Sequence, residues 1–242
     1  MSIQLPHLFA ATTLAAFVLL PNASAHAEQT YISRFDVYTG FTDIESPALG
    51  LSEHNGFHVQ AGMNARRWLS FGGDYSEASG SELLTTDLLP PATQTRVNGA
   101  QAKYIALGLL PANYHLAVPV DAATQTFAFG PQLAFRHFSK VTLFLRPSLG
   151  ALRERAVPHP ADAFQKVIVA GLAPAGFKRD WTNFNGIGGG ADLTLNKHIG
   201  LRAQMDFVYN HPFDDILANG RWTFRYSVGP SFHFGRNIGA HR

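Results

Sequence analysis

Residues 222–234, WTFRYSVGPSFHF, decide the fold of this chain. Apolar or aromatic side chains alternate with small or polar ones over all thirteen positions. A period of two is typical of a β-strand whose two faces meet different environments. The apolar face consists of Trp222, Phe224, Tyr226, Val228, Pro230, Phe232 and Phe234. The stretch therefore predicts a sheet with one wholly apolar face and one polar face.

Seven further segments alternate in the same way, at 31–41, 57–65, 69–75, 127–136, 141–150, 187–195 and 199–209. No charged residue occupies the apolar face of any of them. A charge facing lipid costs about 2 to 4 kcal/mol near the bilayer midplane, whereas arginine and aspartate form compact hydrogen-bonded pairs in a confined space. We therefore expect a polar network inside a barrel, made by Arg34, Asp36, Asp74, Arg136, Arg146, Asp192, Arg202, Asp206 and Arg225.

The connections alternate in length. Those at 66–67, 137–140 and 196–198 are short, and those at 43–55, 79–121, 152–181 and 210–221 are long. Short periplasmic turns and long outer loops are typical of outer-membrane barrels. The pattern predicts an all-β fold, a transmembrane antiparallel up-and-down β-barrel of eight strands with long extracellular loops and short periplasmic turns.

The loop 79–121 leaves an alternative open. If 97–110 and 113–120 are both strands, the barrel has ten strands. Otherwise we expect one short helix at 81–89, capped by Ser81 and ended by Pro90-Pro91. A second short helix is expected at 163–170, before Gly171.

The N-terminus predicts export. Leu8 to Leu20 is apolar and precedes two small-residue sites, Ala23-Ser24-Ala25 and Ala25-His26-Ala27, which is the pattern of a cleaved signal peptide. The apolar run is shorter than the roughly 20 residues that a transmembrane helix needs. We expect a signal peptide at 1–27, an outer-membrane barrel at 28–235 and a periplasmic tail at 236–242.

Composition argues against several function classes. The chain has no cysteine and a formal net charge of only +2, which gives no basis for a disulfide framework or for nucleic-acid binding. Its eleven histidines are scattered without the spacing of metal ligands. We expect no metal site, no cofactor and no nucleic acid partner.

Two local motifs suggest chemistry. Gly186-x-Gly188-x-x-Ala191 matches a dinucleotide-binding fingerprint, but an alternating strand follows it where a helix is required. Ser231 and His233 share one face of the last strand and suggest a membrane-embedded acyl hydrolase, although the sequence indicates no carboxylate to orient the histidine. Polar filling of the lumen is the simpler interpretation of both.

The passage 184–235 carries a family likeness, in Gly188-Gly189-Gly190-Ala191-Asp192, the turn at 196–198, Gly200-Leu201-Arg202 and the terminal strand. Residues 67–75 are similar to a second hairpin of the same kind. On these residues the chain resembles the small bacterial outer-membrane β-barrels of the OmpA/OmpX family. The resemblance implies a monomer that contacts outer-membrane lipid and lipopolysaccharide, with the barrel-assembly machinery acting on the C-terminal strand. The chain departs from the pattern because residues 235–242 extend beyond the terminal aromatic.

Three function classes remain open: a structural or surface-interaction barrel, a small-solute or ion channel of porin-like character, and a lipid A acyl hydrolase or transferase. An eight-stranded barrel has room inside only for its own side chains, so we expect the first class and no enzyme. A soluble lipocalin-type barrel would alternate too, but the uncharged apolar face and the aromatic strand ends oppose it.

Two sets of exterior residues complete the expectation. The lipid-facing side chains of the last strand are Trp222, Phe224, Tyr226, Val228, Phe232 and Phe234. Basic residues near the outer rim are candidates for lipopolysaccharide phosphates, which guanidinium groups bind in pairs of hydrogen bonds. They are Arg153, Arg155, Lys178, Arg179 and Arg221.

Overall fold

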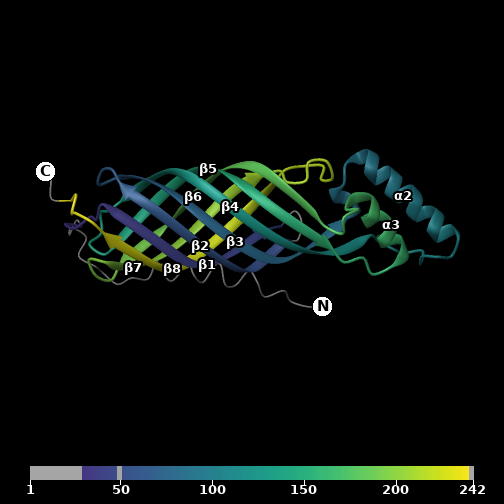
Figure 1. Ribbon diagram of the computed structural model, residues 1–242, viewed down its shortest axis with the longest axis horizontal. Helices are drawn as coiled ribbons and strands as arrows, with labels where there is room; N and C mark the ends of the chain where they lie inside the picture. Colours follow the sequence, from purple (N-terminus) through teal and green to yellow (C-terminus); the bar gives the residue numbers. More distant parts are fainter. Residues whose placement is uncertain (1–28, 48–50, 240–242) are drawn as a thin grey trace.

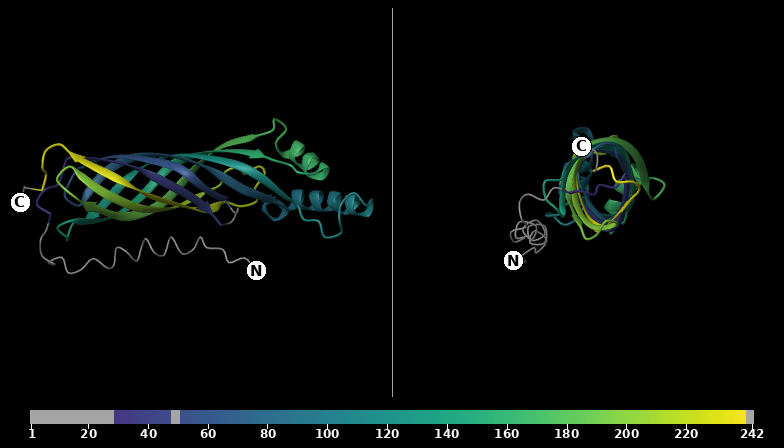
Figure 2. Two further views of the ribbon diagram at one scale, coloured as in Figure 1. Left: turned by 90° about the horizontal axis from the view of Figure 1, so that it is seen from below. Right: turned by 90° about the vertical axis from the view of Figure 1, so that its left-hand side faces the viewer.

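The computed structural model describes residues 29–47 and 51–239, so the predicted signal peptide at 1–27 lies outside the described residues. Eight antiparallel strands pair in sequence order and close into a barrel, because the last strand also pairs with the first (Figure 1). The end view in Figure 2 shows the closed ring. The strands are β1 (Phe35–Ser46), β2 (Leu51–Asn64), β3 (Leu69–Thr85), β4 (Ala117–Phe135), β5 (Val141–Pro158), β6 (Lys178–Thr194), β7 (Ile199–Asn210) and β8 (Arg221–Phe234).

The eight-stranded prediction is confirmed, and the ten-stranded alternative is wrong. Every predicted segment overlaps one strand. β2, β4 and β6 begin before the predicted segments, at Leu51, Ala117 and Lys178, whereas β1 begins later than predicted, at Phe35 rather than Tyr31. The short connections lie at one end of the barrel, at 65–68, 136–140 and 195–198; we call this the turn end. The opposite end, which carries the long connections, is the loop end.

One wall of the barrel is longer than the other. β3 to β6 have 17 to 19 residues, whereas β1, β2, β7 and β8 have 12 to 14. Five extra residues lengthen a strand by roughly 17 Å. Parts of the predicted loops are therefore strand, such as 79–85 and 152–158. Sequence reasoning ended these strands early because their outward residues turn polar there, as at Glu77, Arg153 and Arg155.

The longer wall supports a 3-10 turn, η1 (Thr86–Leu88), and two helices, α2 (Pro91–Ala106) and α3 (Ala163–Leu172) (Figure 1). α3 confirms the helix expected at 163–170. The helix expected at 81–89 is wrong, since residues 81–85 continue β3. Pro91 begins α2 instead of ending a helix, because the first helical position needs no backbone N–H. No helix among the described residues is long and apolar enough to cross a membrane.

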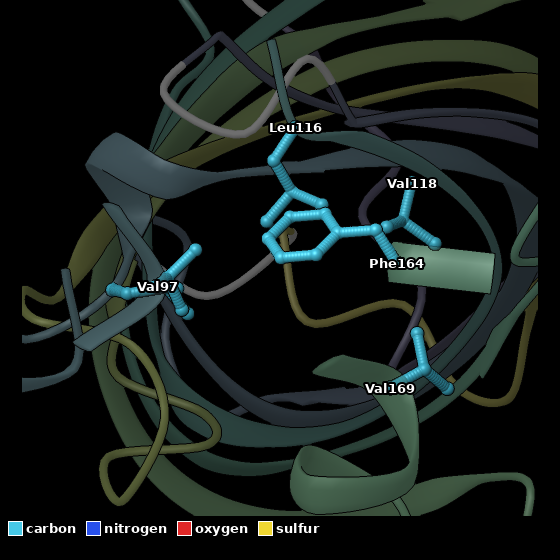
Figure 3. Packing of buried hydrophobic residues seen from close by; sticks show 6 residues of the cluster. Val97, Leu116, Val118, Phe164 and Val169 are labelled. Carbon is cyan, nitrogen blue, oxygen red and sulfur yellow. The ribbon is translucent and has the colours of Figure 1, made fainter. Parts of the chain in front are cut away.

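The two helices share a small core beyond the loop end, which we call the helical lobe (residues 86–116 and 159–177). Tyr114 donates to Asp162 Oδ2 at 2.7 Å, and Asp162 caps α3 by accepting from the Gln165 backbone N–H at 2.8 Å. Burial raises the pKa of the Tyr114 hydroxyl, so it keeps its proton and remains a donor. The buried apolar cluster of the lobe contains Leu89, Val97, Leu116, Phe164 and Val169, together with Val118 from the start of β4 (Figure 3).

Candidate functional site

The outside of the barrel is an apolar belt. Phe41 is 82% exposed and Leu149 70% exposed, although hydrophobic side chains of this size are ordinarily buried. On β8 the outward residues are those expected from the sequence, Trp222, Phe224, Tyr226, Val228, Phe232 and Phe234, and they alternate with buried neighbours. The apolar face therefore points outward, which is the reverse of a lipocalin-type barrel. A continuous exposed apolar surface marks contact with a membrane or with another apolar partner. Further exposed members of the belt are Phe35, Phe57, Phe71, Phe127, Phe129, Leu143, Leu145, Ile187 and Leu201.

Arg225 is the centre of an ion-pair network in the middle of the barrel interior. Its Nε and Nη2 donate to Asp206 Oδ2 at 2.9 and 2.7 Å, and its Nη1 donates to Asp74 Oδ1 at 2.9 Å. Asp74 also pairs with Arg146. The four side chains are between 1% and 7% exposed and come from β3, β5, β7 and β8. The arginine links strands on different sides of the barrel, so charged groups from four strands meet inside it here.

Arg202 is the centre of a second layer of charged side chains, nearer the turn end. It donates to Asp192 Oδ2 from Nη2 at 2.8 Å and to Asp36 Oδ1 at 3.3 Å. Its guanidinium also stacks on Tyr38 and Phe144, 5.6 and 5.2 Å from the two ring centroids. The charge is thus held by two carboxylates and two aromatic faces, as charge pairing and cation–π attraction favour.

Arg136 lies inside the barrel near its turn end. It donates to Gln29 Oε1 at 3.2 Å, to Thr142 Oγ1 at 3.0 Å and to the Arg67 backbone carbonyl at 3.0 Å. Gln29 itself is 7% exposed, so the segment that precedes β1 folds into the barrel opening. The remaining cavity near these residues has a volume of about 30 Å³, close to the share that one or two water molecules occupy.

The expectation for Arg34 is wrong. This residue precedes β1 and donates from Nη1 to the Asn64 backbone carbonyl at 3.1 Å. Its side chain lines a groove outside the lumen together with Arg66 and Trp68. The period-two pattern placed it inward because the strand was extended back to Tyr31, four residues before β1 begins.

A third interior layer, at the loop end, was missed by sequence reasoning. Arg221 pairs with Glu154, donates from Nε to Asn210 Oδ1 at 3.2 Å, and lies 3.9 Å from Glu82 Oε2. Glu53 accepts from Thr124 at 2.9 Å beside them. Continued alternation from Arg146 to Glu154 and from Asp74 to Glu82 would have found two of these glutamates. A register shift between Glu53 and Phe57 hid the third.

Arg221 was expected to contact lipopolysaccharide, and its position in this interior layer shows that the expectation is wrong. The residue is only 4% exposed and its charge is already paired with Glu154 inside the barrel. Lys178 is also paired, with Asp215 in the β7–β8 connection. The other three predicted basic residues lie on the outer surface. Arg153 is placed over the Trp181 ring at 5.7 Å, and Arg155 and Arg179 flank the Phe177 ring at 5.2 and 5.0 Å.

Ser231 and His233 have a carboxylate beside them after all, which the sequence did not indicate. Ser231 Oγ donates to Asp192 Oδ1 at 2.9 Å and lies 3.4 Å from His233 Nε2. The same Nε2 is 3.6 Å from Asp192, so serine and aspartate face one ring nitrogen. In a hydrolase triad the carboxylate orients the base through its other nitrogen. The three residues are therefore arranged as a polar cluster and not as a charge-relay site.

The glycine motif has a structural reason. A Cβ at Gly188 would overlap the Asp206 carboxylate, and one at Gly190 would meet the Phe144 ring at 2.7 Å. Small residues at these inward positions of β6 leave room for large neighbours. No helix follows the motif, since β7 comes next. Among the described residues, no group of three or more His, Cys, Asp or Glu side chains is arranged to hold a metal ion.

Known proteins share this fold. No family model matches the chain, and no curated protein matches it either. Among solved structures, Neisserial surface protein A has 12% sequence identity and a TM-score of 0.50, covering 83% of this chain and 96% of that one. Ail, the attachment invasion locus protein of Yersinia pestis, has 9% identity and a TM-score of 0.44 over 84% and 97%. The N-terminal β-barrel domain of Pseudomonas aeruginosa OprF has 12% identity and a TM-score of 0.35 over 84% and 98%.

The likeness to Neisserial surface protein A establishes the fold. The chain has the closed, antiparallel eight-stranded architecture of the small outer-membrane barrels, as its resemblance to the OmpA/OmpX family predicts.

Proposed function

We propose that the protein is an integral outer-membrane β-barrel with a structural and surface-interaction role and a lumen closed by its own side chains. The turn end faces the periplasm, and the loop end carries the helical lobe outside the cell. This orientation follows the rule that outer-membrane barrels have short periplasmic turns and long external loops.

The observation that carries the proposal is the set of three charged layers inside the barrel. Each layer holds an ion pair between strands that are not adjacent, namely Arg225 with Asp74, Arg202 with Asp36 and Arg221 with Glu154. Ions in such a path would have to displace buried pairs, which is strongly unfavourable when one partner is left alone. The closed lumen therefore favours a surface role over transport.

Single-channel recording in a planar bilayer tests this directly. The wild-type barrel is expected to give no stable current step. A reproducible unit conductance in the wild type would establish the channel and overturn the closed-lumen proposal.

An enzymatic role has less support. The polar cluster at Ser231 lacks the geometry of a hydrolase, and it faces a cavity of about 30 Å³, far smaller than the roughly 300 to 1,000 Å³ of ordinary ligand pockets. Mass analysis of lipid A from cells with and without the gene is expected to show one acyl pattern. A difference that Ser231→Ala abolishes would reinstate the enzyme.

Lipopolysaccharide is the outer partner that the proposal includes. Arg153, Arg155 and Arg179 lie on the exterior of β5 and β6, just beyond lipid-facing Phe127 and Leu149, where phosphates of the outer leaflet lie. Replacing the three with glutamine is expected to weaken binding of purified lipopolysaccharide about fivefold per charge. Arg96→Gln with Lys103→Gln on α2 is the control. Equal weakening in both variants would reject the site.

A further inference from the structure

The segment before β1, residues 29–34, crosses the opening of the barrel at the turn end, and we call it the strap. Gln29 is 7% exposed, Ile32 2% and Ser33 5%. Connecting segments are ordinarily exposed, because their backbone polar groups need water as a partner. Burial of the strap therefore depends on the hydrogen bonds that it makes with the rest of the protein.

The far end of the strap is bound to the β4–β5 side of the opening. The Gln29 side chain donates from Nε2 to Thr142 Oγ1 at 3.0 Å and accepts from Arg136 Nη1 at 3.2 Å. Nearer β1, the Ser33 carbonyl accepts from Asn64 Nδ2 at 3.0 Å. Thr142 belongs to β5, which lies opposite β1 in the ring of eight strands. The strap therefore spans the opening from one side to the other.

The strap covers the second charged layer of the lumen. Residues 29 and 31–33 line the cavity of about 30 Å³ together with Asp36, Asp192 and Arg202. These three charged side chains are between 3% and 4% exposed. Displacement of the strap would open this cavity to solvent at the turn end.

The chain after the last strand holds the strap in place. Residues 235–239, which we call the latch, lie at the same end of the barrel as the strap (Figure 1). Asn237 Oδ1 accepts from the Ile32 N–H at 2.9 Å, and Asn237 Nδ2 donates to the Thr30 carbonyl at 3.1 Å. The Ile238 N–H donates to the Ile32 carbonyl at 2.8 Å. The latch thus extends the contact between the two ends of the barrel beyond the pairing of β1 with β8.

Two local features position the latch. Gly235 has a φ of 90°, a left-handed conformation that glycine adopts without a steric penalty, and its carbonyl accepts from Tyr31 Oη at 3.3 Å. Asn237 Oδ1 also accepts from the Gly239 N–H at 2.9 Å. One side chain, that of Asn237, therefore both folds the latch and joins it to the strap.

We propose that the strap closes the turn-end opening and that the latch holds it closed, so that loss of the Asn237 bonds exposes the strap and the cavity beneath it to solvent. The device goes beyond the proposed function, since it concerns one end of the lumen and acts whether or not the barrel has a surface partner.

The test uses one introduced cysteine as a reporter, because the chain contains no cysteine. Ser33→Cys places a thiol in the strap at a buried position that lines the cavity. Ser139→Cys, in the exposed turn between β4 and β5, gives the rate of an unprotected thiol. The purified full-length barrel in detergent micelles is treated with a charged maleimide, and the rate of modification is followed by mass spectrometry.

Ser33→Cys is expected to react much more slowly than Ser139→Cys. Adding Asn237→Ala should raise the rate at Ser33→Cys about tenfold, because two hydrogen bonds between latch and strap are lost. Ile238→Pro, which removes the N–H bonded to the Ile32 carbonyl, is a second and independent way to release the strap. It should raise the rate about fivefold.

The matched control is Asn196→Ala in the β6–β7 turn at the same end. Asn196 Oδ1 accepts from the His198 and Ile199 N–H groups at 2.8 and 3.0 Å, so the variant removes a similar pair of bonds from a different turn. It is expected to leave the rate at Ser33→Cys unchanged. Heat-modifiability on a gel verifies that every variant is folded.

Three results would overturn the proposal. Equal rates at Ser33→Cys with and without the Asn237→Ala and Ile238→Pro changes would reject the latch, and so would an equal acceleration by Asn196→Ala. Modification of Ser33→Cys as fast as that of Ser139→Cys in the otherwise unchanged protein would reject closure by the strap. Thiol labelling measures the strap, whereas conductance of the wild type tests the closed lumen, so the two proposals can fail separately.

Discussion

Replacing Arg225 with methionine should be among the most destabilising substitutions in the barrel. Arg225 makes five side-chain hydrogen bonds, two to Asp206 and one each to Asp74, Ser76 and Thr126. In the variant, Asp74 retains its pair with Arg146. Asp206 retains a longer bond from Gln204, at 3.3 Å, and its buried charge is left without a cation.

The expected size of the effect follows from that uncompensated charge. Removing one partner of a buried ion pair costs about 3 to 5 kcal/mol. Neutralising the stranded aspartate should recover part of this loss. We therefore expect the double variant Arg225→Met with Asp206→Asn to be about 2 kcal/mol more stable than the sum of the two single variants predicts.

Urea unfolding in phospholipid vesicles, followed by heat-modifiability on gels, measures both quantities. Arg136→Met, at the barrel opening, is a comparison for loss of an arginine whose hydrogen-bond acceptors are neutral. A loss below about 1 kcal/mol for Arg225→Met, or strict additivity in the double variant, would refute the inference that Arg225 compensates Asp206.

Other substitutions test the exterior, the glycine motif and the lobe. Val228→Arg should make the free energy of membrane insertion less favourable by about 2 to 4 kcal/mol, measured by insertion into vesicles. Val228→Leu should insert like the wild type. Equal insertion of the two variants would contradict the outward assignment of Val228. Gly188→Ala should lower the free energy of unfolding in urea by about 1 to 3 kcal/mol, because Arg225 holds the Asp206 carboxylate that the new Cβ would meet. Gly73→Ala, whose Cβ would have ordinary contacts, should lower it less. A larger loss for Gly73→Ala than for Gly188→Ala would contradict this packing. Asp162→Ala should reduce the stability of the first turn of α3 by about 1 kcal/mol and so speed tryptic cleavage at Lys166 about fivefold. The heat-modifiability of the barrel should stay unchanged. An unchanged cleavage rate would contradict the role of Asp162 as the helix cap.

Prediction worked best where each strand faces two different environments. The eight segments were recognisable because their outward residues carry no charge and are nearly all apolar. The same criterion failed on the extensions of β3 to β6, where the outward face becomes polar. It also failed in the helical lobe, where Pro91 starts a helix although it had been interpreted as part of a stop signal.

The inner residues were predictable as a set but not as pairs. Alternation placed Asp36, Asp192 and Arg202 on one face, yet nothing local indicates that one arginine binds both aspartates. The partners lie 10 and 166 positions from it along the chain. Arg34 and Arg221 were misplaced for a related reason, because each lies near a strand boundary that the alternation did not locate.

The sequence alone therefore determined the barrel, its strand number and the two faces of each strand. Those features follow from a period of two and from the cost of charge in lipid, which act on each segment separately. Only the tertiary structure decided which charges neutralise one another. The Arg225 layer depends on strand register and on closure of β8 against β1, because closure brings residues from opposite ends of the chain within hydrogen-bonding distance.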